Sequence, residues 1–263
     1  MRLDSFLHDK GLVKSRERAK KIIISGNVSV NGSSVTKPSS DVCDTDDVVI
    51  NDDYCKYVGR GGLKLEGAIK EFSIDITGLV CADIGASTGG FTDCMLQNGA
   101  KKVYAVDVGH GQLDGSLRDD KRVVDLEGVN VRYLEPDIFD EKPSFISCDL
   151  SFISLKLVME KLIGVLADDG SMVVLIKPQF EVGRSAIGKN GIVNDKKAHI
   201  RMLDEMLMYF YSLGIVTLGL TYSSVTGGDG NIEYLAYLSL NDEADFSAFD
   251  TKELVDKAFK TLK

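Results

Sequence analysis

The sequence lacks the patterns that stabilise secreted, metal-binding and membrane proteins. Its five cysteines are odd in number and form no C-x-x-C pair, so neither a disulfide framework nor a zinc site is expected. No apolar run approaches the roughly 20 residues of a membrane-spanning helix, and charges near the first residue disfavour a signal peptide. The histidines show no ligand spacing and are expected at the surface: His8, His110 and His199. These absences favour a reduced, cytoplasmic protein that needs no metal and no membrane.

Positive residues are outnumbered by acidic ones overall, 31 to 40, but they are concentrated at the start of the chain. The formal net charge is −9, yet residues 1–37 alone carry +5, which leaves −14 on the remainder. A basic head on an acidic body favours contact between that head and a polyanion. The 263 residues leave room for one small and one large domain.

Residues 83–92, with the sequence Asp-Ile-Gly-Ala-Ser-Thr-Gly-Gly-Phe-Thr, lie between a predicted buried strand and a predicted helix. A strand, a glycine-rich turn and a helix start together form a nucleotide-type cradle. The dinucleotide pattern G-x-G-x-x-G is incomplete here, because Ser87 takes its middle position. Asp83 at the strand end disfavours a pyrophosphate and favours a cationic group. S-adenosylmethionine is therefore a better candidate cofactor than NAD.

The chain from residue 62 onward alternates strand and helix patterns, which is typical of a doubly wound parallel sheet. Strands are predicted at 79–84, 102–107, 122–126, 144–149, 172–177, 215–222 and 234–238, and helices at 154–166, 195–213 and 251–262. The last two strands follow each other without a helix. This order matches the class I methyltransferase plan, an α/β fold with a seven-stranded, mostly parallel sheet whose last strand lies antiparallel beside the fifth.

The first 50 residues predict a separate small α+β unit. Helices are expected at 2–9 and 16–25, and Asn31-Gly32 is a strong hairpin signal between short strands. The spaced residues Arg2-Leu-Asp4, Gly26-x-Val28-x-Val30-Asn31-Gly32 and Lys37-Pro38 resemble the S4 RNA-binding domain. The resemblance implies a basic face that contacts RNA phosphates rather than bases. The expected contacts are Arg2, Lys10, Arg16, Arg18, Lys20, Lys21 and Arg60. The predicted organisation is an S4-like domain at 1–52, a linker at 53–61 and a methyltransferase domain at 62–263.

Four charged residues are expected to meet at one edge of the large sheet. Ligands of open α/β sheets bind at the carboxyl ends of the parallel strands. Asp149 and Lys177 end the fourth and fifth predicted strands. If the last strand is antiparallel, its beginning lies at the same edge, which places Glu233 there. Lys64 lies near the start of the helix before the first strand. Strand and helix directions alone therefore bring these four residues to the cradle.

The set Lys64, Asp149, Lys177 and Glu233 resembles the catalytic tetrad of FtsJ-like RNA 2′-O-methyltransferases. Together with the S4-like head, the chain resembles the TlyA family of S4-bearing rRNA (cytidine-2′-O)-methyltransferases, often labelled hemolysins. The matching segments are Gly59-Arg-Gly-Gly-Leu-Lys64, 83–92, Tyr104-Ala-Val-Asp-Val-Gly109, Cys148-Asp-Leu-Ser-Phe-Ile-Ser154, Ile176-Lys-Pro-Gln-Phe-Glu181 and Gly230-Asn-Ile-Glu-Tyr234. The resemblance implies methyl transfer from S-adenosylmethionine to a cytidine of 16S or 23S rRNA, or both, in ribosomal subunits.

The implied roles follow from the residue types. Lys177 would stabilise the developing alkoxide, or accept its proton if its pKa is depressed, while the carboxylates hold the two lysines. Asp107 would bind the cofactor ribose, and Glu127 and Phe152 would lie near the adenine. The full set of expected cofactor contacts is Asp83, Gly85, Ala86, Ser87, Thr88, Gly89, Gly90, Phe91, Asp107, Val108, Glu127, Asp149 and Phe152.

Three other functions remain open at this point. A membrane-active hemolysin would need an amphipathic or membrane-spanning segment, which the sequence does not offer. A non-catalytic RNA-binding assembly factor could keep the same cradle without using it. An NAD-dependent enzyme is disfavoured by Ser87 and by the basic head.

Overall fold

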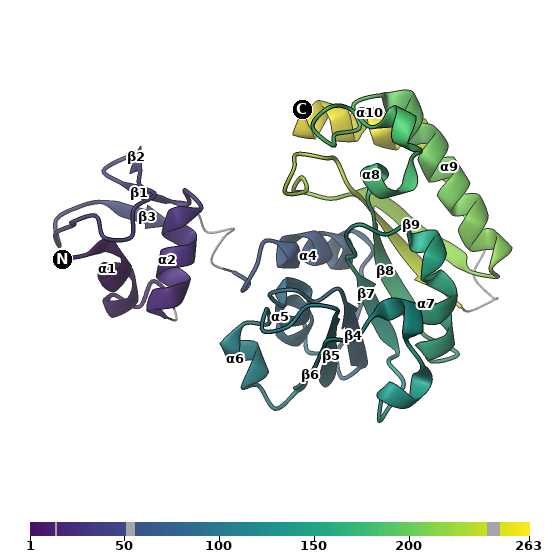
Figure 1. Cartoon of the computed structure of the whole chain (residues 1–263), viewed down its shortest axis with the longest axis horizontal. Helices are drawn as coiled ribbons and strands as arrows, with labels where there is room; N and C mark the ends of the chain where they lie inside the picture. Colours follow the sequence, from purple (N-terminus) through teal and green to yellow (C-terminus); the bar gives the residue numbers. More distant parts are fainter. Residues whose placement is uncertain (14, 51–55, 241–247) are drawn as a thin grey trace. The chain divides into compact units, whose positions relative to one another are not determined.

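The computed structural model describes residues 1–13, 15–50, 56–240 and 248–263. It divides into two compact units, Met1–Arg60 and Gly61–Lys263 (Figure 1). Part of the predicted linker, residues 53–55, lies outside the described residues. The exact limits of the predicted domains therefore stay a prediction.

The first unit packs two helices against a three-stranded antiparallel sheet of order β2-β1-β3. Its elements are α1 (Leu3–Asp9), α2 (Arg16–Ile24), β1 (Val28–Val30), β2 (Ser33–Ser34) and β3 (Val48–Ile50). Ser15 caps α2 by accepting the backbone N–H of Arg18 at 3.2 Å. Asn31 and Gly32 both have positive φ, as the predicted hairpin turn requires.

The second unit is built on a seven-stranded sheet of order β6-β5-β4-β7-β8-β10-β9. The strands are β4 (Val80–Ile84), β5 (Lys102–Asp107), β6 (Val123–Glu127), β7 (Phe145–Cys148), β8 (Ser171–Ile176), β9 (Val216–Tyr222) and β10 (Tyr234–Ser239). The strands from β4 to β8 pair in parallel, and β10 runs antiparallel between β8 and β9. This topology confirms the predicted fold class.

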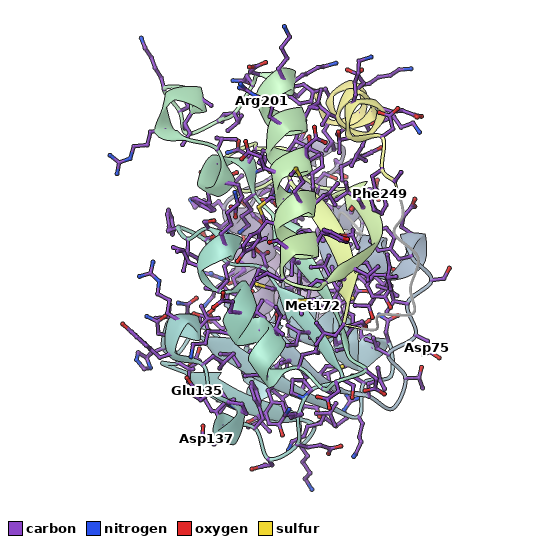
Figure 2. The ribbon with its side chains drawn as sticks, turned by 90° about the vertical axis from the view of Figure 1, so that its right-hand side faces the viewer. Asp75, Glu135, Asp137, Met172, Arg201 and Phe249 are labelled. Atoms are coloured by element: carbon purple, nitrogen blue, oxygen red, sulfur yellow. The ribbon has the colours of Figure 1, made fainter. Side chains whose placement is uncertain are left out.

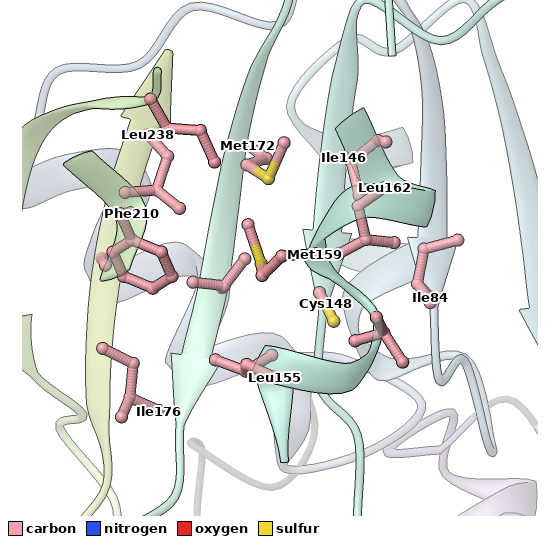
Figure 3. Packing of buried hydrophobic residues seen from close by; sticks show 14 of the residues in the cluster. Ile84, Ile146, Cys148, Leu155, Met159, Leu162, Met172, Ile176, Phe210 and Leu238 are labelled. Carbon is pink, nitrogen blue, oxygen red and sulfur yellow. The ribbon is translucent and has the colours of Figure 1, made fainter. Parts of the chain in front are cut away.

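Helices cover both faces of this sheet. On one face, α7 (Met159–Val165), α9 (Lys196–Ser212) and α10 (Thr251–Leu262) bury the apolar side chains of alternate strand residues, as Figure 3 shows around Met159 and Met172. Figure 2 shows α9, marked by Arg201, with α10 beside it. On the other face, α5 (Gly90–Gln97) packs on α4 (Gly61–Glu71) and on β4. Alternation along β4 sends Asp83 toward this second face.

Short elements complete the second unit. They are α6 (Gly115–Arg118), α8 (Pro178–Glu181), and the 3-10 turns η1 (Val131–Tyr133), η2 (Pro136–Ile138), η3 (Leu155–Leu157) and η4 (Arg184–Ala186). The helix predicted at 154–166 is split into η3 and α7, because Val158 has φ −129° and leaves the helical conformation. Ser154 caps the first part by accepting the N–H of Lys156.

His199 corrects one prediction from the sequence. It was expected at the surface, but its exposed fraction is 0%. It lies on the inner face of α9 with Met202, Leu203 and Met206, which are spaced at helical intervals and point to the sheet. The sequence pattern of an apolar helix face includes position 199, so a buried histidine was open to prediction there.

Within the described parts of the chain, no helix is long and apolar enough to cross a membrane. The same residues contain no cluster of three or more His, Cys, Asp or Glu that could hold a metal ion. Four cysteines there are free thiols: Cys43, Cys81, Cys94 and Cys148.

Candidate active site

Four elements bring the predicted tetrad to the carboxyl edge of the sheet. Asp149 follows β7 directly, and Lys177 follows β8 as the residue before α8. Glu233 precedes β10, whose first residue pairs with Ile176 at the end of β8. Lys64 lies in the first turn of α4. These four side chains form a charged tetrad.

The charged tetrad forms one continuous chain of ion pairs. Lys177 Nζ lies 2.5 Å from Asp149 Oδ1, and Lys64 Nζ lies 3.5 Å from Asp149 Oδ2. Lys64 also donates to Glu233 Oε2 at 2.6 Å. Asp149 is thus shared by both lysines, and Glu233 holds the far end of Lys64. The convergence that strand direction predicted is present in the structure.

These charges are largely removed from water. Lys64 and Lys177 are each 8% exposed, and Glu233 is 2% exposed. Burial alone would lower the pKa of Lys64, but the charges of Asp149 and Glu233 outweigh it and raise that pKa. Lys64 is therefore a fixed ammonium. Buried charges persist only when paired, and here each one has a partner within 3.5 Å.

A cavity of about 460 Å³ opens beside the charged tetrad. It falls within the size range of small-molecule sites, roughly 300–1,000 Å³. Its lining residues are Ile84, Gly85, Ser87, Val106, Asp107, Val108, Gln112, Val129, Asn130, Val131, Arg132, Asp149, Leu150, Ser151, Phe152 and Ile153. This sheet-edge cavity is bounded by the ends of β4, β5, β6 and β7. A second cavity of about 500 Å³ lies between α4, β9 and α10, and its lining includes no predicted site residue.

The turn after β4 comes very close to the loop after β7. Gly85 has φ +89°, and a Cβ there would lie 2.3 Å from the carbonyl oxygen of Asp149. Only glycine fits this position, because a side chain would be both strained and in collision. Ser87 adopts φ +49° at the position where the dinucleotide pattern has glycine. Asp107 holds this turn, since its carboxylate accepts the backbone N–H of Ser87 at 2.8 Å.

Six of the thirteen cofactor contacts expected from the sequence line the sheet-edge cavity, and seven do not. Those that line the sheet-edge cavity are Gly85, Ser87, Asp107, Val108, Asp149 and Phe152. Those that do not line it are Asp83, Ala86, Thr88, Gly89, Gly90, Phe91 and Glu127. Phe152 is 91% exposed with φ +65°, and its ring centroid lies 5.5 Å from that of Phe180.

Asp83 does not present its charge to the cavity, contrary to the interpretation of the turn as a direct cation site. Its exposed fraction is 0%, and its carboxylate accepts the backbone N–H of Thr92 at 2.8 Å, the hydroxyl of Thr92 at 2.7 Å and the hydroxyl of Ser147 at 3.2 Å. Burial raises the pKa of Asp83 to about 7, against these hydrogen bonds. Asp83 instead fixes the start of α5 to β4, which positions the turn.

Glu127, which was expected near an adenine, does not line the sheet-edge cavity and uses its carboxylate to hold a loop. Its carboxylate accepts backbone N–H groups of Gly111, Gln112 and Leu113 at 2.6, 2.6 and 2.9 Å. These hydrogen bonds lower its pKa. Glu127 therefore anchors the loop after β5, and through that loop it places Gln112 on the cavity wall.

The sequence interpretation missed several lining residues. Ser151 accepts a hydrogen bond from Lys177 Nζ at 3.0 Å, and Gln112, Asn130 and Arg132 line the sheet-edge cavity. Each follows the carboxyl end of a strand, in a loop whose path has no strong sequence signal. Their positions after β5, β6 and β7 were the one clue available.

Comparisons with known proteins now bear on this geometry. The family model described as FtsJ-like methyltransferase matches residues 57–240, and the S4 domain model matches residues 1–49. The chain belongs to the FtsJ-like methyltransferase family. It carries an S4 domain before the FtsJ-like domain, which is the arrangement of the TlyA group.

Relatives of this FtsJ-like protein are similar over nearly their full length. The Mycobacterium tuberculosis 16S/23S rRNA (cytidine-2′-O)-methyltransferase TlyA is 40% identical, over 98% of this chain and 96% of the relative. Hemolysin A of Brachyspira hyodysenteriae is 44% identical, over 90% and 99% respectively. A solved Streptococcus thermophilus structure, named as a hemolysin, is 44% identical with a TM-score of 0.80, over 99% of this chain and 96% of that chain.

The predicted RNA contacts of the S4 domain differ in their surroundings. Arg16 and Lys21 are exposed on α2. Arg18 instead donates to the backbone carbonyls of Tyr57 and Val58. Four of the predicted contacts have acidic neighbours: Arg2 donates to Asp4 at 2.8 Å, Arg16 lies 3.6 Å from Asp4, Lys10 lies 2.8 Å from Asp44, and Lys20 donates to Glu17 at 2.6 Å. Arg60 is exposed.

Proposed function

We propose that this chain transfers a methyl group from S-adenosylmethionine to the ribose 2′-hydroxyl of a cytidine in ribosomal RNA. The observation that carries the proposal is the charged tetrad beside the sheet-edge cavity, in which Asp149 belongs to both. A methyl donor in that cavity would lie next to Lys177. The family membership and the name of the Mycobacterium tuberculosis relative support the same reaction.

The residues of the sheet-edge cavity fit S-adenosylmethionine. Gly85 lets the turn after β4 approach the cofactor closely. Asp107, at the end of β5, can accept hydrogen bonds from the ribose hydroxyls, and Val108 and Phe152 offer apolar surface. The cofactor supplies an electrophilic methyl group on a sulfonium. Asp83 and Glu127 act indirectly in this proposal, because one holds the glycine turn and the other holds the loop of Gln112.

The charged tetrad would activate and align the nucleophile. S-adenosylmethionine would supply the methyl group and leave as the neutral thioether S-adenosylhomocysteine. The 2′-hydroxyl would pass its proton to solvent water as it attacks, and negative charge would develop on its oxygen as the proton leaves. Lys177 would stabilise that charge, while Asp149 and Ser151 hold its ammonium at 2.5 and 3.0 Å. Lys64 and Glu233 keep Asp149 fixed and the total charge balanced. Much of the acceleration would come from alignment of hydroxyl and methyl group.

The substrate proposal combines the two domains. The S4 domain offers exposed Arg16 and Lys21 to RNA phosphates, and such contacts position a substrate without reading its sequence. We expect structured rRNA in assembled 16S- or 23S-containing subunits, in the cytoplasm, to be the acceptor. No metal and no membrane enter the proposed reaction.

The direct test is transfer of tritiated methyl from S-adenosylmethionine to purified ribosomal subunits. The chain should label RNA, and Lys177→Met should reduce the rate by about 10²–10⁴-fold. Lys121→Met, which changes an exposed lysine of the same domain, should keep the wild-type rate. Labelling by no subunit preparation would instead identify an RNA-binding assembly factor.

A further inference from the structure

His199 occupies a buried position where both of its ring nitrogens are used. Nε2 lies 3.0 Å from the backbone carbonyl of Val193, and Nδ1 lies 2.8 Å from the hydroxyl of Tyr234. A carbonyl can only accept, so Nε2 must carry the proton. Nδ1 then accepts the hydrogen bond from Tyr234. Burial lowers the pKa of His199, so the ring is neutral and links a loop to β10 in one defined tautomer.

Asn231 binds the same loop from the other side. Its Oδ1 accepts the N–H of Val193 at 3.0 Å, and its Nδ2 donates to the carbonyl of Gly191 at 3.0 Å. Both backbone groups of Val193 are thus taken by side chains, one from α9 and one from the segment before β10. The side chains in this network are fully buried, namely Val193, His199, Asn231 and Tyr234. Water therefore cannot satisfy their polar groups if one of these hydrogen bonds is lost.

The two residues that this network holds, Asn231 and Tyr234, flank Glu233 in sequence. Glu233 is packed tightly as well, since a Cβ on Gly227 would lie 2.5 Å from its Oε1. The N–H of Gly227 donates to the carbonyl of Asn231 at 2.9 Å, so the backbone that packs against Glu233 is bonded to the segment that contains Glu233. The carboxylate that pairs with Lys64 is therefore fixed by backbone whose ends are both anchored to the 191–199 region.

The C-terminal helix closes the network from outside. The ring of Phe259 on α10 meets that of His199 edge-on, with centroids 5.1 Å apart. Lys196 lies 2.6 Å from Asp256, and Lys263 donates to Asn194 at 2.5 Å, so charged contacts pin α10 over this region. Helix α10 lies beyond the part of the chain that the FtsJ-like family model matches, residues 57–240.

We propose that His199, together with Asn231 and Tyr234, positions Glu233 and thereby sets the geometry of Lys64 and Asp149. His199 is a positioning residue, because it touches neither the sheet-edge cavity nor the charged tetrad. An apolar side chain of similar size could fill the same space. It could not fix the direction of the Val193 carbonyl and the Tyr234 hydroxyl, and a small displacement at a reacting site can cost about 10²-fold in rate. This proposal rests on the methyl transfer proposed above.

The test compares variants that keep the shape but remove defined hydrogen bonds. His199→Phe removes both bonds, Tyr234→Phe removes one hydroxyl, and His199→Gln retains a donor that can reach Val193. We expect His199→Phe to lower kcat by about 10- to 100-fold with the KM for S-adenosylmethionine within about twofold of wild type. Tyr234→Phe should lose less, and His199→Gln should recover part of the loss.

The matched control is Phe210→Leu, a buried change on the same helix with no polar link to β10. All rates are normalised to the folded fraction at the assay temperature. A kcat for His199→Phe and Tyr234→Phe no lower than that of Phe210→Leu would overturn the proposal. So would a loss expressed only in KM. Tyr234→Phe keeps the test valid if His199→Phe does not fold.

A crystal structure of Tyr234→Phe gives a readout that does not depend on activity. We expect the Glu233 carboxylate to move away from the 2.6 Å contact with Lys64. An unchanged contact would refute the positioning role. If the wild-type chain transferred no methyl group at all, the proposed function would fail, and this structure would still decide the role of His199.

Discussion

Lys64 and Glu233 are 169 residues apart in sequence, yet Lys64 Nζ donates to Glu233 Oε2 at 2.6 Å. Lys64 comes from the first helix of the FtsJ-like domain, and Glu233 is the residue before its antiparallel strand β10. The pair therefore forms only when the sheet is complete. The pair also couples stability to function, because the same contact stabilises the fold and shapes the candidate active site.

Glu233→Gln should lower both stability and activity. It leaves Lys64 with Asp149 as its one carboxylate partner, at 3.5 Å, in a buried place. We expect a loss of about 2 kcal/mol in the free energy of unfolding, measured by urea titration, because an uncompensated buried charge is costly. Methyl transfer should fall by at least about 10²-fold.

The double variant Lys64→Met with Glu233→Leu removes both charges and should regain most of the lost stability, since apolar replacement of a buried pair is often neutral. It should remain inactive. A Glu233→Gln variant with wild-type stability and rate would show that the pair matters for neither.

Gly85→Ala should weaken cofactor binding by more than the strain of its backbone conformation explains. The new Cβ would lie 2.3 Å from the Asp149 carbonyl oxygen, at φ +89°. Gly78→Ala is the control, because its φ is +75° but nothing lies within 4 Å of a Cβ there. Both variants should lose about 1 kcal/mol from strain. Calorimetry should show weakened S-adenosylmethionine binding for Gly85→Ala alone, and equal affinities would contradict the proposed cofactor site.

Arg16→Ala and Lys21→Ala should weaken RNA binding in a salt-dependent way. Each exposed cation that contacts a phosphate contributes about −0.9 to the slope of log K against log salt on a duplex, and about −0.7 on a single strand. Filter binding to ribosomal RNA at several salt concentrations should therefore show a shallower slope, while the Kd for S-adenosylmethionine stays unchanged.

Arg18→Ala serves as the contrast within the same helix. Its guanidinium donates to the carbonyls of Tyr57 and Val58, so the variant should lower the thermal stability of the S4 domain. The salt slope should change less than for Arg16→Ala. A larger change in the salt slope for Arg18→Ala would mean that Arg18 gives up its hydrogen bonds to these carbonyls and contacts RNA instead.

Asp83 should make stability depend on pH in an identifiable direction. Burial raises its pKa to about 7 from an ordinary value of 3.8, so between these values the folded chain holds a proton that the unfolded chain has lost. The contribution of this group is fully present below about pH 4 and is lost as pH rises through 7.

The stability difference between wild type and Asp83→Asn should therefore shrink, or reverse, between pH 5 and pH 8 in urea titrations. Asp75→Asn, an exposed change in the segment before β4, should give a difference that is flat over this range. A constant difference for Asp83→Asn would show that the carboxyl keeps an ordinary pKa.

The strand pattern predicted the sheet and the meeting of the charged tetrad well, for a physical reason. Buried parallel strands appear as short apolar runs, and their direction alone decides which residues share an edge. Asp149 and Lys177 needed no further information. Glu233 needed the assumption that the last strand is antiparallel. Lys64 needed the assumption that its helix runs opposite to β4.

The loops could not be predicted in the same way. Whether Asp83 faces a ligand or caps a helix depends on which donors reach it, and Thr92 and Ser147 reach it only in the folded chain. Glu127 binds three successive N–H groups of a loop whose path no periodicity reveals. The buried network of His199 likewise depends on pairings between three separate segments.

The most direct measurement maps methyl groups in ribosomal RNA after reaction in vitro. Subunits from cells that lack the gene are incubated with the chain and S-adenosylmethionine, and the RNA is hydrolysed in alkali, which leaves the bond after a 2′-O-methylated ribose intact. Mass spectrometry should find an alkali-resistant dinucleotide that begins with methylated cytidine, produced by the wild-type chain and not by Lys177→Met. A methyl group on a base, or none on any nucleotide, would contradict ribose methylation by the charged tetrad.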